Sequence, residues 1–322
     1  MPRFALLFFC FSCFASQANT LLQPQLEQLW QQGAYADAKA LLVPKIDRRT
    51  KDAFLLSALG RTELALGDTE QAEQLLNRAV KAEPANAEYQ FLYGQANCNG
   101  AQKAGMFGAL SRAKRCVKAF ETAHQLSPET PQYMQALAQF YAQAPGIAGG
   151  DKDKALQLAK TLQQYAPLKG QLLELELLLQ QNPEQAQALL ASSTELQQRP
   201  EPYFMQAVGL ASKRDYSAAI ALFQQATEQP APDLDAQRSQ LMARYQLGRA
   251  AVLGKIEQEQ GIHALQQFIA DGSIADFQEW AQFRLAQLYQ ATEQPEKANA
   301  LLLPLQASTK DDALKTEIKK IL

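Results

Sequence analysis

Five basic residues cluster between residues 103 and 118, where the chain could bind an acidic group. The sequence contains no Asp or Glu from Tyr89 to Phe120. A local excess of positive charge attracts phospholipid headgroups, anionic glycans and acidic peptides, so one hypothesis is a basic edge that binds such a partner. The alternative is a solvated helix face, which is typical of a run of charges. The cluster consists of Lys103, Arg112, Lys114, Arg115 and Lys118.

Two cysteines lie near this basic segment: Cys98 just before it and Cys116 within it. In an oxidising compartment a disulfide bond between them would close the intervening stretch of chain. The alternative is that Cys116 stays free and is buried at a position where helix packing needs a small side chain. The sequence leaves both alternatives open.

A glycine-rich stretch, Gly146–Lys152 (GIAGGDK), precedes a predicted helix. The free amides at a helix N-terminus can bind an anion. However, the spacing differs from that of a phosphate-binding loop, because no Gly-Lys-Ser/Thr follows and no strand precedes it. Asp151 is placed to cap the helix and to occupy those amides itself. The pattern therefore favours a structural turn.

The sequence shows no group of residues with the spacing of a catalytic or metal site. Its two histidines, His124 and His263, are far apart, which argues against a mononuclear zinc site or a histidine-based triad. Glu174 and Glu176 lie in a leucine-rich segment and are expected on its solvated face. The net charge of −2 gives no overall basic field for nucleic acid. We therefore predict a protein that is not an enzyme, with no cofactor, no metal and no nucleic-acid partner.

The first 18 residues differ from the rest of the chain. Arg3 is followed by an apolar run of eleven residues, Phe4–Phe14, and then by small residues before Asn19. This pattern predicts a secretory signal peptide, residues 1–18, that is cut after Ala18. The run is too short to span a bilayer, and no later stretch is apolar enough to do so. Alternatives are an uncleaved anchoring segment or a lipoprotein signal. We expect a periplasmic or secreted protein.

The elements that position these residues follow a 34-residue unit, which is clearest at Ala53–Asn86. Counted from Ala53, small residues occupy places 8, 20 and 27, and leucines occupy places 4, 7 and 24. Two antiparallel helices approach closely only where side chains are small, with larger apolar side chains filling the adjacent space. Gly67-Asp68 is predicted to form the turn between the helices, and Pro84 to end the second helix. Pro44 and Pro304 are expected to shorten or bend the helices that contain them.

This unit resembles the tetratricopeptide repeat, and degenerate copies extend over residues 19–322. The resemblance implies an all-α fold: a right-handed superhelical solenoid of about eight helix pairs in one domain, residues 19–322, with a C-terminal capping helix. Two further segments, Gln132–Lys160 with its APGIAGG stretch and Ala243–Leu253, resemble a group of exported proteobacterial tetratricopeptide proteins. That resemblance implies fold and compartment more than function.

The resemblance also places one set of side chains on the inner, concave surface of the solenoid. Amide side chains with scattered aromatics are suited to extended peptides or glycans. The alternative for each residue is ordinary exposed helix surface. The predicted inner-surface residues are Phe91, Gln95, Gln135, Gln139, Phe204, Trp280 and Phe283.

Two insertions interrupt consecutive units, about Gly100–Ala109 and Pro145–Gly150. Equivalent loops of stacked repeats lie on the same edge, so these insertions are expected to be neighbours and to mark a binding face. The favoured hypothesis is a periplasmic scaffold that binds a protein or peptide during envelope assembly or secretion. The alternative is an accessory protein that binds an anionic polysaccharide or lipid during export.

Overall fold

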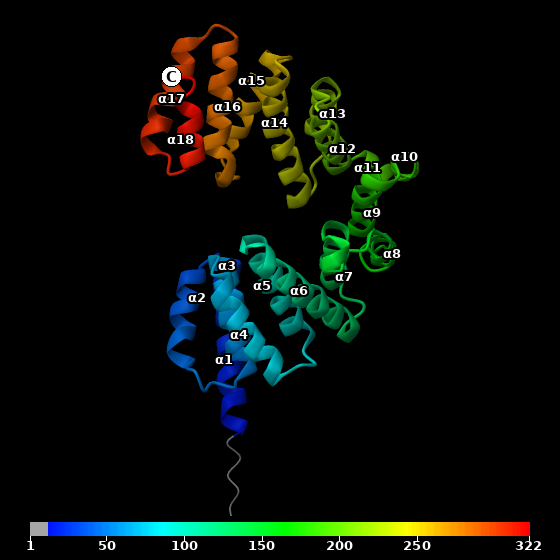
Figure 1. The fold of residues 1–322 in the computed structure, drawn as a ribbon, viewed down its shortest axis with the longest axis vertical. Helices are drawn as coiled ribbons and strands as arrows, with labels where there is room; N and C mark the ends of the chain where they lie inside the picture. The colour runs from blue at the N-terminus through cyan, green and yellow to red at the C-terminus, as the bar shows by residue number, and fades with distance from the viewer. Residues whose placement is uncertain (1–11) are drawn as a thin grey trace, which may run out of the picture. The chain divides into compact units, whose positions relative to one another are not determined.

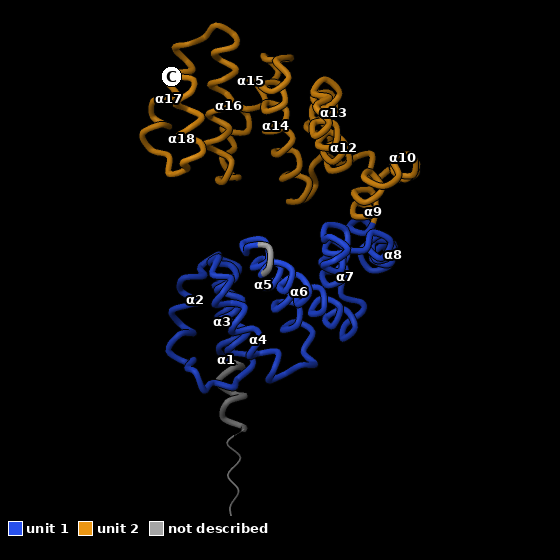
Figure 2. Tube along the Cα trace, in the orientation of Figure 1, with its two compact units in different colours: residues 1–170 blue, residues 171–322 orange. Residues whose placement is uncertain are grey.

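The computed structural model describes residues 12–322, apart from the side chains of residues 12–20, Met106 and Phe107. Within these residues every regular element is helical and no β-strand occurs, so the predicted all-α class is confirmed. The chain divides into two compact units, Met1–Gly170 and Gln171–Leu322 (Figure 2). We describe each unit by itself. The single domain over residues 19–322 stays a prediction. So does the signal peptide, most of which lies outside the described residues.

The helices of unit 1 follow one another as antiparallel neighbours, joined by short connections (Figure 1). Short 3-10 turns follow α2 and α7. The elements are α1 (Ser12–Gln31), α2 (Tyr35–Leu42), η1 (Val43–Lys45), α3 (Ala53–Leu66), α4 (Thr69–Ala82), α5 (Ala87–Lys103), α6 (Met106–Leu126), α7 (Pro131–Gln143), η2 (Gly146–Ala148) and α8 (Lys152–Leu162).

Unit 2 begins within α9 and has the same kind of arrangement (Figure 1). The last element, α18, packs on α17 as the predicted C-terminal cap. The elements are α9 (Pro167–Gln181), α10 (Pro183–Ser192), α11 (Thr194–Gln197), α12 (Pro200–Ser212), α13 (Tyr216–Glu228), α14 (Leu234–Gly254), α15 (Gln258–Asp271), η3 (Ala275–Phe277), α16 (Gln278–Ala291), α17 (Pro295–Ser308) and α18 (Asp312–Ile318).

Within each unit, alternate helices also touch. In unit 1, α1 contacts α3 and α3 contacts α5; in unit 2, α12 contacts α14 and α14 contacts α16. This is the pattern of stacked helix pairs, in which each pair buries its apolar face against the next pair. The first helices of successive pairs therefore form one continuous face of each unit.

Close contact between paired helices occurs at the small residues that the repeat pattern singled out. A Cβ atom at Gly60 would lie 2.6 Å from Cγ of Leu76, the leucine at place 24. The equivalent contact in unit 2 is tighter, because a Cβ at Gly248 would lie 2.2 Å from Cγ of Leu265. Both leucines are fully buried, and burying a leucine side chain stabilises a fold by about 1.5–3 kcal/mol.

The predicted turn and stop signals in the best-defined unit are confirmed. Gly67 ends α3 in the left-handed region, at φ 85°, which a residue without a Cβ adopts readily. Asp68 caps α4 by accepting a hydrogen bond from the backbone N–H of Gln71 at 3.0 Å. Helix α4 ends at Ala82, two residues before Pro84. Local sequence therefore determines where these two helices begin and end.

One expectation about helix boundaries needs correction. The segment Gly100–Ala109 is not an inserted loop; it lengthens α5 and α6, and only Ala104 and Gly105 lie between the two helices. Pro304 lies inside α17, which continues to Ser308, so of the two effects expected of it the helix is not shortened. Pro44 acts as expected, because α2 gives way to a 3-10 turn at that point. Long paired helices bury more surface than a solvated loop, which favours the helical extension.

A buried acid, Glu63, occupies place 11 of the unit Ala53–Asn86, where the equivalent residues of two later units are Tyr141 and Tyr289. Glu63 on α3 is 2% exposed, and its carboxylate accepts a bond from Nζ of Lys39 on α2 at 2.9 Å. The neighbouring Thr62 accepts a hydrogen bond from the indole N–H of Trp30 on α1 at 3.0 Å. Polar contacts thus join α1, α2 and α3 at this point, where other repeats use an aromatic ring.

An ion network of two buried side chains and one exposed carboxylate joins two helix starts in unit 2. Arg199, just before α12, contacts Glu201 at 2.6 Å and Asp233 at 2.8 Å, and the side chains of Arg199 and Glu201 are both 7% exposed. Asp233 also caps α14 by accepting a bond from the N–H of Ala236 at 2.9 Å. The bond from Arg199 lowers the pKa of the Asp233 carboxyl below its ordinary value. The network fixes α12 against the start of α14.

Candidate functional site

The main concave site in unit 1 is a groove of about 830 Å³ between α5, α6, α7 and the η2 turn. Its floor is apolar, with Leu110, Ala113, Phe120 and Phe140 among the side chains that line it. Ile147 lies at the rim on η2 and is 74% exposed. We call this site the unit 1 groove. Both predicted insertions contribute to it, so the expectation that they are neighbours is confirmed, although the first one is helical.

Amide side chains follow two helices along the unit 1 groove. Gln95, Asn99 and Gln102 recur at helical spacing on α5, while Gln139 and Gln143 are one turn apart on α7. Each amide offers both a hydrogen-bond donor and an acceptor. No charged residue is among the described residues that line the groove. Such a lining can pair with the backbone of an extended chain while its apolar floor receives side chains.

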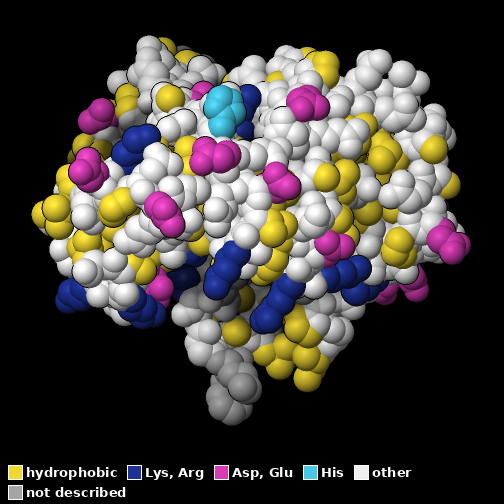
Figure 3. Space-filling model, turned by 90° about the horizontal axis from the view of Figure 1, so that it is seen from above, with side chains coloured by type: hydrophobic (Ala, Val, Ile, Leu, Met, Phe, Trp, Pro, Cys, Tyr) yellow, Lys and Arg dark blue, Asp and Glu magenta, His cyan; other side chains and the backbone are white. Residues whose placement is uncertain are grey.

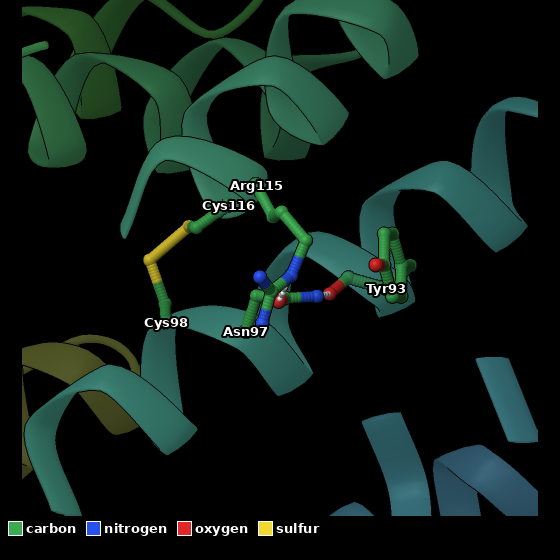
Figure 4. The surroundings of a disulfide bond; sticks show 5 residues. All are labelled: Tyr93, Asn97, Cys98, Arg115 and Cys116. Atoms are coloured by element: carbon green, nitrogen blue, oxygen red, sulfur yellow. Dashed lines mark hydrogen bonds between the residues drawn. A yellow bond between two sulfur atoms is a disulfide. The ribbon is translucent and has the colours of Figure 1, made fainter. Parts of the chain in front are cut away.

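A disulfide bond fixes the two helices that form one wall of the groove. Cys98 on α5 is bonded to Cys116 on α6, with the Cα atoms 5.3 Å apart (Figure 4). Cys98 also lines the groove, whereas Cys116 is fully buried. Of the two alternatives from the sequence, the structure has the disulfide and not the free cysteine. The bond restrains α5 and α6 beside the residues that line the groove.

A buried amide supports the same wall. Asn97 is fully buried; its amide donates to the carbonyl of Tyr93 at 2.8 Å and accepts a bond from Nε of Arg115 at 2.8 Å (Figure 4). Arg115 continues the network to the carboxylate of Glu73 on α4, at 2.8 Å. Buried polar groups are retained when they are fully paired, and here they join three helices.

The glycine-rich turn between α7 and α8 has a structural role. Gly149 has φ 103°, and a Cβ at Gly150 would lie 1.7 Å from the carbonyl oxygen of Ala144, so only glycine fits that position. Asp151 caps α8 by accepting from the N–H of Lys154 at 3.1 Å, as expected. The turn therefore presents Ile147 at the groove rim, and its helix N-terminus is already capped.

The basic cluster does not form one unpaired surface. Arg112 and Arg115 both bind Glu73, at 2.9 and 2.8 Å, although the sequence around them lacks acids. Lys103 donates to the carbonyl of Gly67 at 3.0 Å. Lys114 and Lys118, the remaining two, are exposed. None of the five basic side chains lines the groove. In the face drawn in Figure 3, charged side chains of both signs are scattered among uncharged ones.

The predicted inner-surface residues of unit 1 divide into three amides, of which only Gln139 is fully exposed, and one buried ring. Gln95 and Gln139 line the groove. Gln95 also lines a second hollow of about 450 Å³, next to α3, together with Phe91. Phe91 itself is only 4% exposed, because its ring packs against Phe120 and Tyr133. Gln135 is half-buried and lines neither hollow.

In unit 2 the predicted inner-surface aromatics are mainly packing residues. Phe283 is fully buried, so it is unavailable to a partner and the expectation that it lies on the open surface is wrong. The physical reason is that its ring packs edge-on against Trp280, with centroids 5.7 Å apart. Trp280 is half-buried and donates its indole N–H to Asp311 at 3.0 Å. Phe204 is half-buried against Phe223.

Sequence reasoning missed several groove residues and the acid that pairs with two arginines of the basic cluster. Gln102 was hidden by the assumption of a loop, and Asn99 and Leu110 flank that segment, although all three lie on helices. Glu73 could not be paired with Arg112 from the sequence, because 39 residues separate them. A search for helical periodicity across residues 100–109 is the signal that could have found the groove wall.

Neither a metal site nor a membrane span occurs in the part of the chain that the structure describes. No three His, Cys, Asp or Glu side chains there are grouped so that they could hold a metal ion. No helix among residues 12–322 is both long enough and apolar enough to cross a bilayer.

The comparison with protein families identifies the repeat. Residues 29–96 match the family described as "Tetratricopeptide repeat", and this segment contains α2, α3 and α4 in full. Residues 29–96 are therefore similar to tetratricopeptide repeats, a class of paired helices. The match covers the unit from which the repeat was predicted, Ala53–Asn86. No curated protein matches the chain.

Solved structures with similar architecture share little sequence with this chain. A thermophilic tetratricopeptide repeat protein of Thermus thermophilus is 20% identical, covering 70% of this chain and 97% of its own, with a TM-score of 0.43. PilW, a type IV pilus biogenesis factor, is 13% identical, with coverages of 84% and 99% and a TM-score of 0.46. A tetratricopeptide repeat protein from Parabacteroides merdae is 11% identical, with coverages of 94% and 98% and a TM-score of 0.48. These values are too low to transfer a function.

Proposed function

We propose that this protein is a non-catalytic scaffold that binds an extended segment of a protein partner in the unit 1 groove. The observation that carries the proposal is the lining itself: two rows of amides over an apolar floor, without a charged side chain among the described residues. An extended polypeptide has unpaired backbone N–H and C=O groups that amides can satisfy. The volume of about 830 Å³ is within the usual range for binding sites.

We further propose that the protein is exported to the periplasm and acts in envelope assembly or secretion. The apolar run Phe4–Phe14 followed by small residues supports a signal peptide. The disulfide between Cys98 and Cys116 supports an oxidising compartment, where such bonds persist. Leu22 and Leu26 of α1 are buried, which supports a mature chain that keeps the residues after Ala18.

An anionic polysaccharide or lipid is a weaker candidate for the partner. The groove offers such a ligand no cation. Arg112 and Arg115, the inner members of the basic cluster, share the carboxylate of Glu73 and would have to leave it to bind an anion. The free energy lost by breaking an existing ion pair is larger than the free energy gained from a solvent-exposed contact with an anion. The geometry therefore supports an uncharged stretch of polypeptide.

Selection from a displayed library of unstructured peptides tests the groove. We expect selected peptides to carry alternating apolar residues and to lose more than about tenfold in affinity for Ala113→Glu, which places an unpaired charge on the apolar floor. The matched control is Lys114→Gln, on the adjacent but exposed position of α6, which should bind as the wild type does. Equal binding to Ala113→Glu and wild type would show that the groove is not the binding site.

N-terminal sequencing of the exported protein tests the compartment. The expected first residue is Asn19, from cleavage after Ala18. A protein that retains Met1, or one that begins at a lipid-modified cysteine, would contradict the proposed processing.

A further inference from the structure

A partly buried arginine in unit 2 has no acidic partner. The guanidinium of Arg284 on α16 lies over the rings of Trp280 and Phe283, 5.5 and 5.4 Å from their centroids. Its Nε is buried and has no hydrogen-bond acceptor. Within the described chain, its one hydrogen bond runs from Nη1 to the amide oxygen of Gln287, at 2.7 Å. An aromatic face holds the guanidinium flat, but it supplies no anion for the fork of N–H groups.

Two acids of the C-terminal segment, Glu317 and Asp311, are already engaged. Glu317 on α18 favours the charged arginine electrostatically, but its carboxylate is bonded to Lys320 at 2.5 Å. Asp311 caps α18 and accepts the indole N–H of Trp280. Burial and the neighbouring charge of Arg249 lower the pKa of the Arg284 guanidinium. Arg284 therefore has no ion-pair partner among the described residues, although Glu317 favours its charge from a distance.

Helix α14 adds a second cation near Arg284. Arg249 is exposed and makes only a long bond of 3.3 Å to Gln246. Between the two arginines and the core lies Tyr245, which is 6% exposed and whose ring packs between Phe268 and Phe277, with centroids 5.4 and 5.1 Å away. Burial raises the pKa of the Tyr245 hydroxyl above its ordinary value, and the charges of Arg284 and Arg249 oppose that shift only in part. Two cations on contacting helices, α14 and α16, are thus near one another.

We propose that Arg284 and Arg249 form a binding site for an acidic side chain, Asp or Glu, of a protein partner. We call it the unit 2 arginine site. A planar carboxylate matches the guanidinium fork with two parallel charge-assisted bonds, and Arg249 can contact the same group from α14. The half-buried Trp280 offers a face for the methylene part of that side chain. This site lies in unit 2 and is independent of the unit 1 groove.

Fluorescence of Trp280 gives a direct readout of this site. The sequence has two tryptophans, so Trp30→Phe leaves Trp280 as the only one. The probe is an oligoglutamate peptide with an acetylated N-terminus and an amidated C-terminus, which has side-chain carboxylates only. We expect it to change the emission of Trp280 and to bind less tightly as salt is added. A capped oligoglutamine peptide of the same length should not bind.

Variants distinguish binding by specific arginines from general electrostatic attraction of an acidic peptide. Arg284→Gln should weaken oligoglutamate binding about tenfold, the usual loss for a charge-assisted pair. Arg284→Lys should lose part of that affinity, because it keeps the charge but not the fork. Arg249→Gln provides a second test on another helix. The matched control is Arg238→Gln, an exposed arginine of α14 outside the site, which should bind like wild type; circular dichroism checks that each variant is folded.

Four results would overturn the proposal. The first two are unchanged binding in folded Arg284→Gln and Arg249→Gln, and an equal loss in Arg238→Gln. The third is binding of oligoglutamine with a free C-terminus at the affinity of oligoglutamate, which would assign the site to a terminal carboxylate. The fourth is tighter binding of inorganic phosphate through the same arginines.

Discussion

The unit 1 groove and the unit 2 arginine site are built from the same kind of helix pair, yet they offer a partner different chemistry. In unit 1 Arg112 and Arg115 are paired with Glu73, and the groove presents amides over apolar side chains. In unit 2 Arg284 lies on aromatic rings without an acidic partner. The repeat requires only the small and large residues that pack two helices, so the outward positions are free to differ.

The units also differ in what holds their helices in place. Unit 1 uses a covalent bond between α5 and α6 beside its groove, whereas unit 2 contains no cysteine and uses the ion network of Arg199, Glu201 and Asp233. Each unit also contains one tryptophan, Trp30 in unit 1 and Trp280 in unit 2. Single-tryptophan variants therefore report on each unit separately.

The largest effect is expected from removing the centre of the ion network in unit 2. Arg199→Leu leaves Glu201 buried without its cation and should lower the free energy of unfolding by about 3–5 kcal/mol. Denaturant titration of Trp280 fluorescence, in the Trp30→Phe background, measures it. Arg238→Gln serves as the exposed control. A loss below about 1 kcal/mol, the value of a surface pair, would mean that solvent reaches Glu201.

The next largest effect is expected in unit 1, from removal of its disulfide bond. Replacing both Cys98 and Cys116 with serine should lower the free energy of unfolding by about 2–4 kcal/mol, because the unfolded chain regains the freedom that the crosslink removes. Trp30 fluorescence, in the Trp280→Phe background, should show the shift. The Trp280 signal of the Trp30→Phe protein should hardly change on reduction. If both signals shift equally, the two units unfold as one and the contrast between them fails.

A smaller effect is expected from overpacking one helix pair. Ala79 on α4 is fully buried at a small-residue place of the repeat, and Ala79→Leu should destabilise unit 1 by about 1–3 kcal/mol. Ala40→Leu, at an exposed position of α2, is the matched control. Thermal melting compares the two. Equal melting temperatures for the two variants would show that the pairing of α3 with α4 is wrong.

The smallest effect is a pH dependence that should appear in unit 2. Arg199 lowers the pKa of Asp233 in the folded protein below its ordinary value of 3.8. A depressed folded pKa contributes stability above that ordinary value, and this contribution is lost as the pH falls through the folded pKa. Urea titrations of Trp280 between about pH 5 and pH 2.5 should show the decrease, and it should be smaller in Asp233→Asn. An identical decrease in Asp233→Asn would assign it to other carboxyls.

The sequence predicts the packing of the repeat better than it predicts the sites, and particular residues show why. Gly60 and Leu76 meet because their spacing is local to one helix pair. The contact of Glu73 with Arg112 depends on how one pair stacks on the next, and helical periodicity gives no such distance. The surroundings of Arg284 are equally long-range, since they depend on α14 and α18, which lie far from it in the sequence. Contacts within a pair were therefore predictable, and charge balance between pairs was not.

Hydrogen exchange of the full chain with two peptides tests the contrast between the units most directly. A peptide selected for the groove should slow exchange in α5 and α7, and added salt should leave that protection unchanged, because the described groove residues have no charge. Capped oligoglutamate should slow exchange in α14 and α16, and salt should remove that protection. Protection of the same unit by both peptides, or salt-sensitive protection in unit 1, would contradict a division of chemistry between the two units.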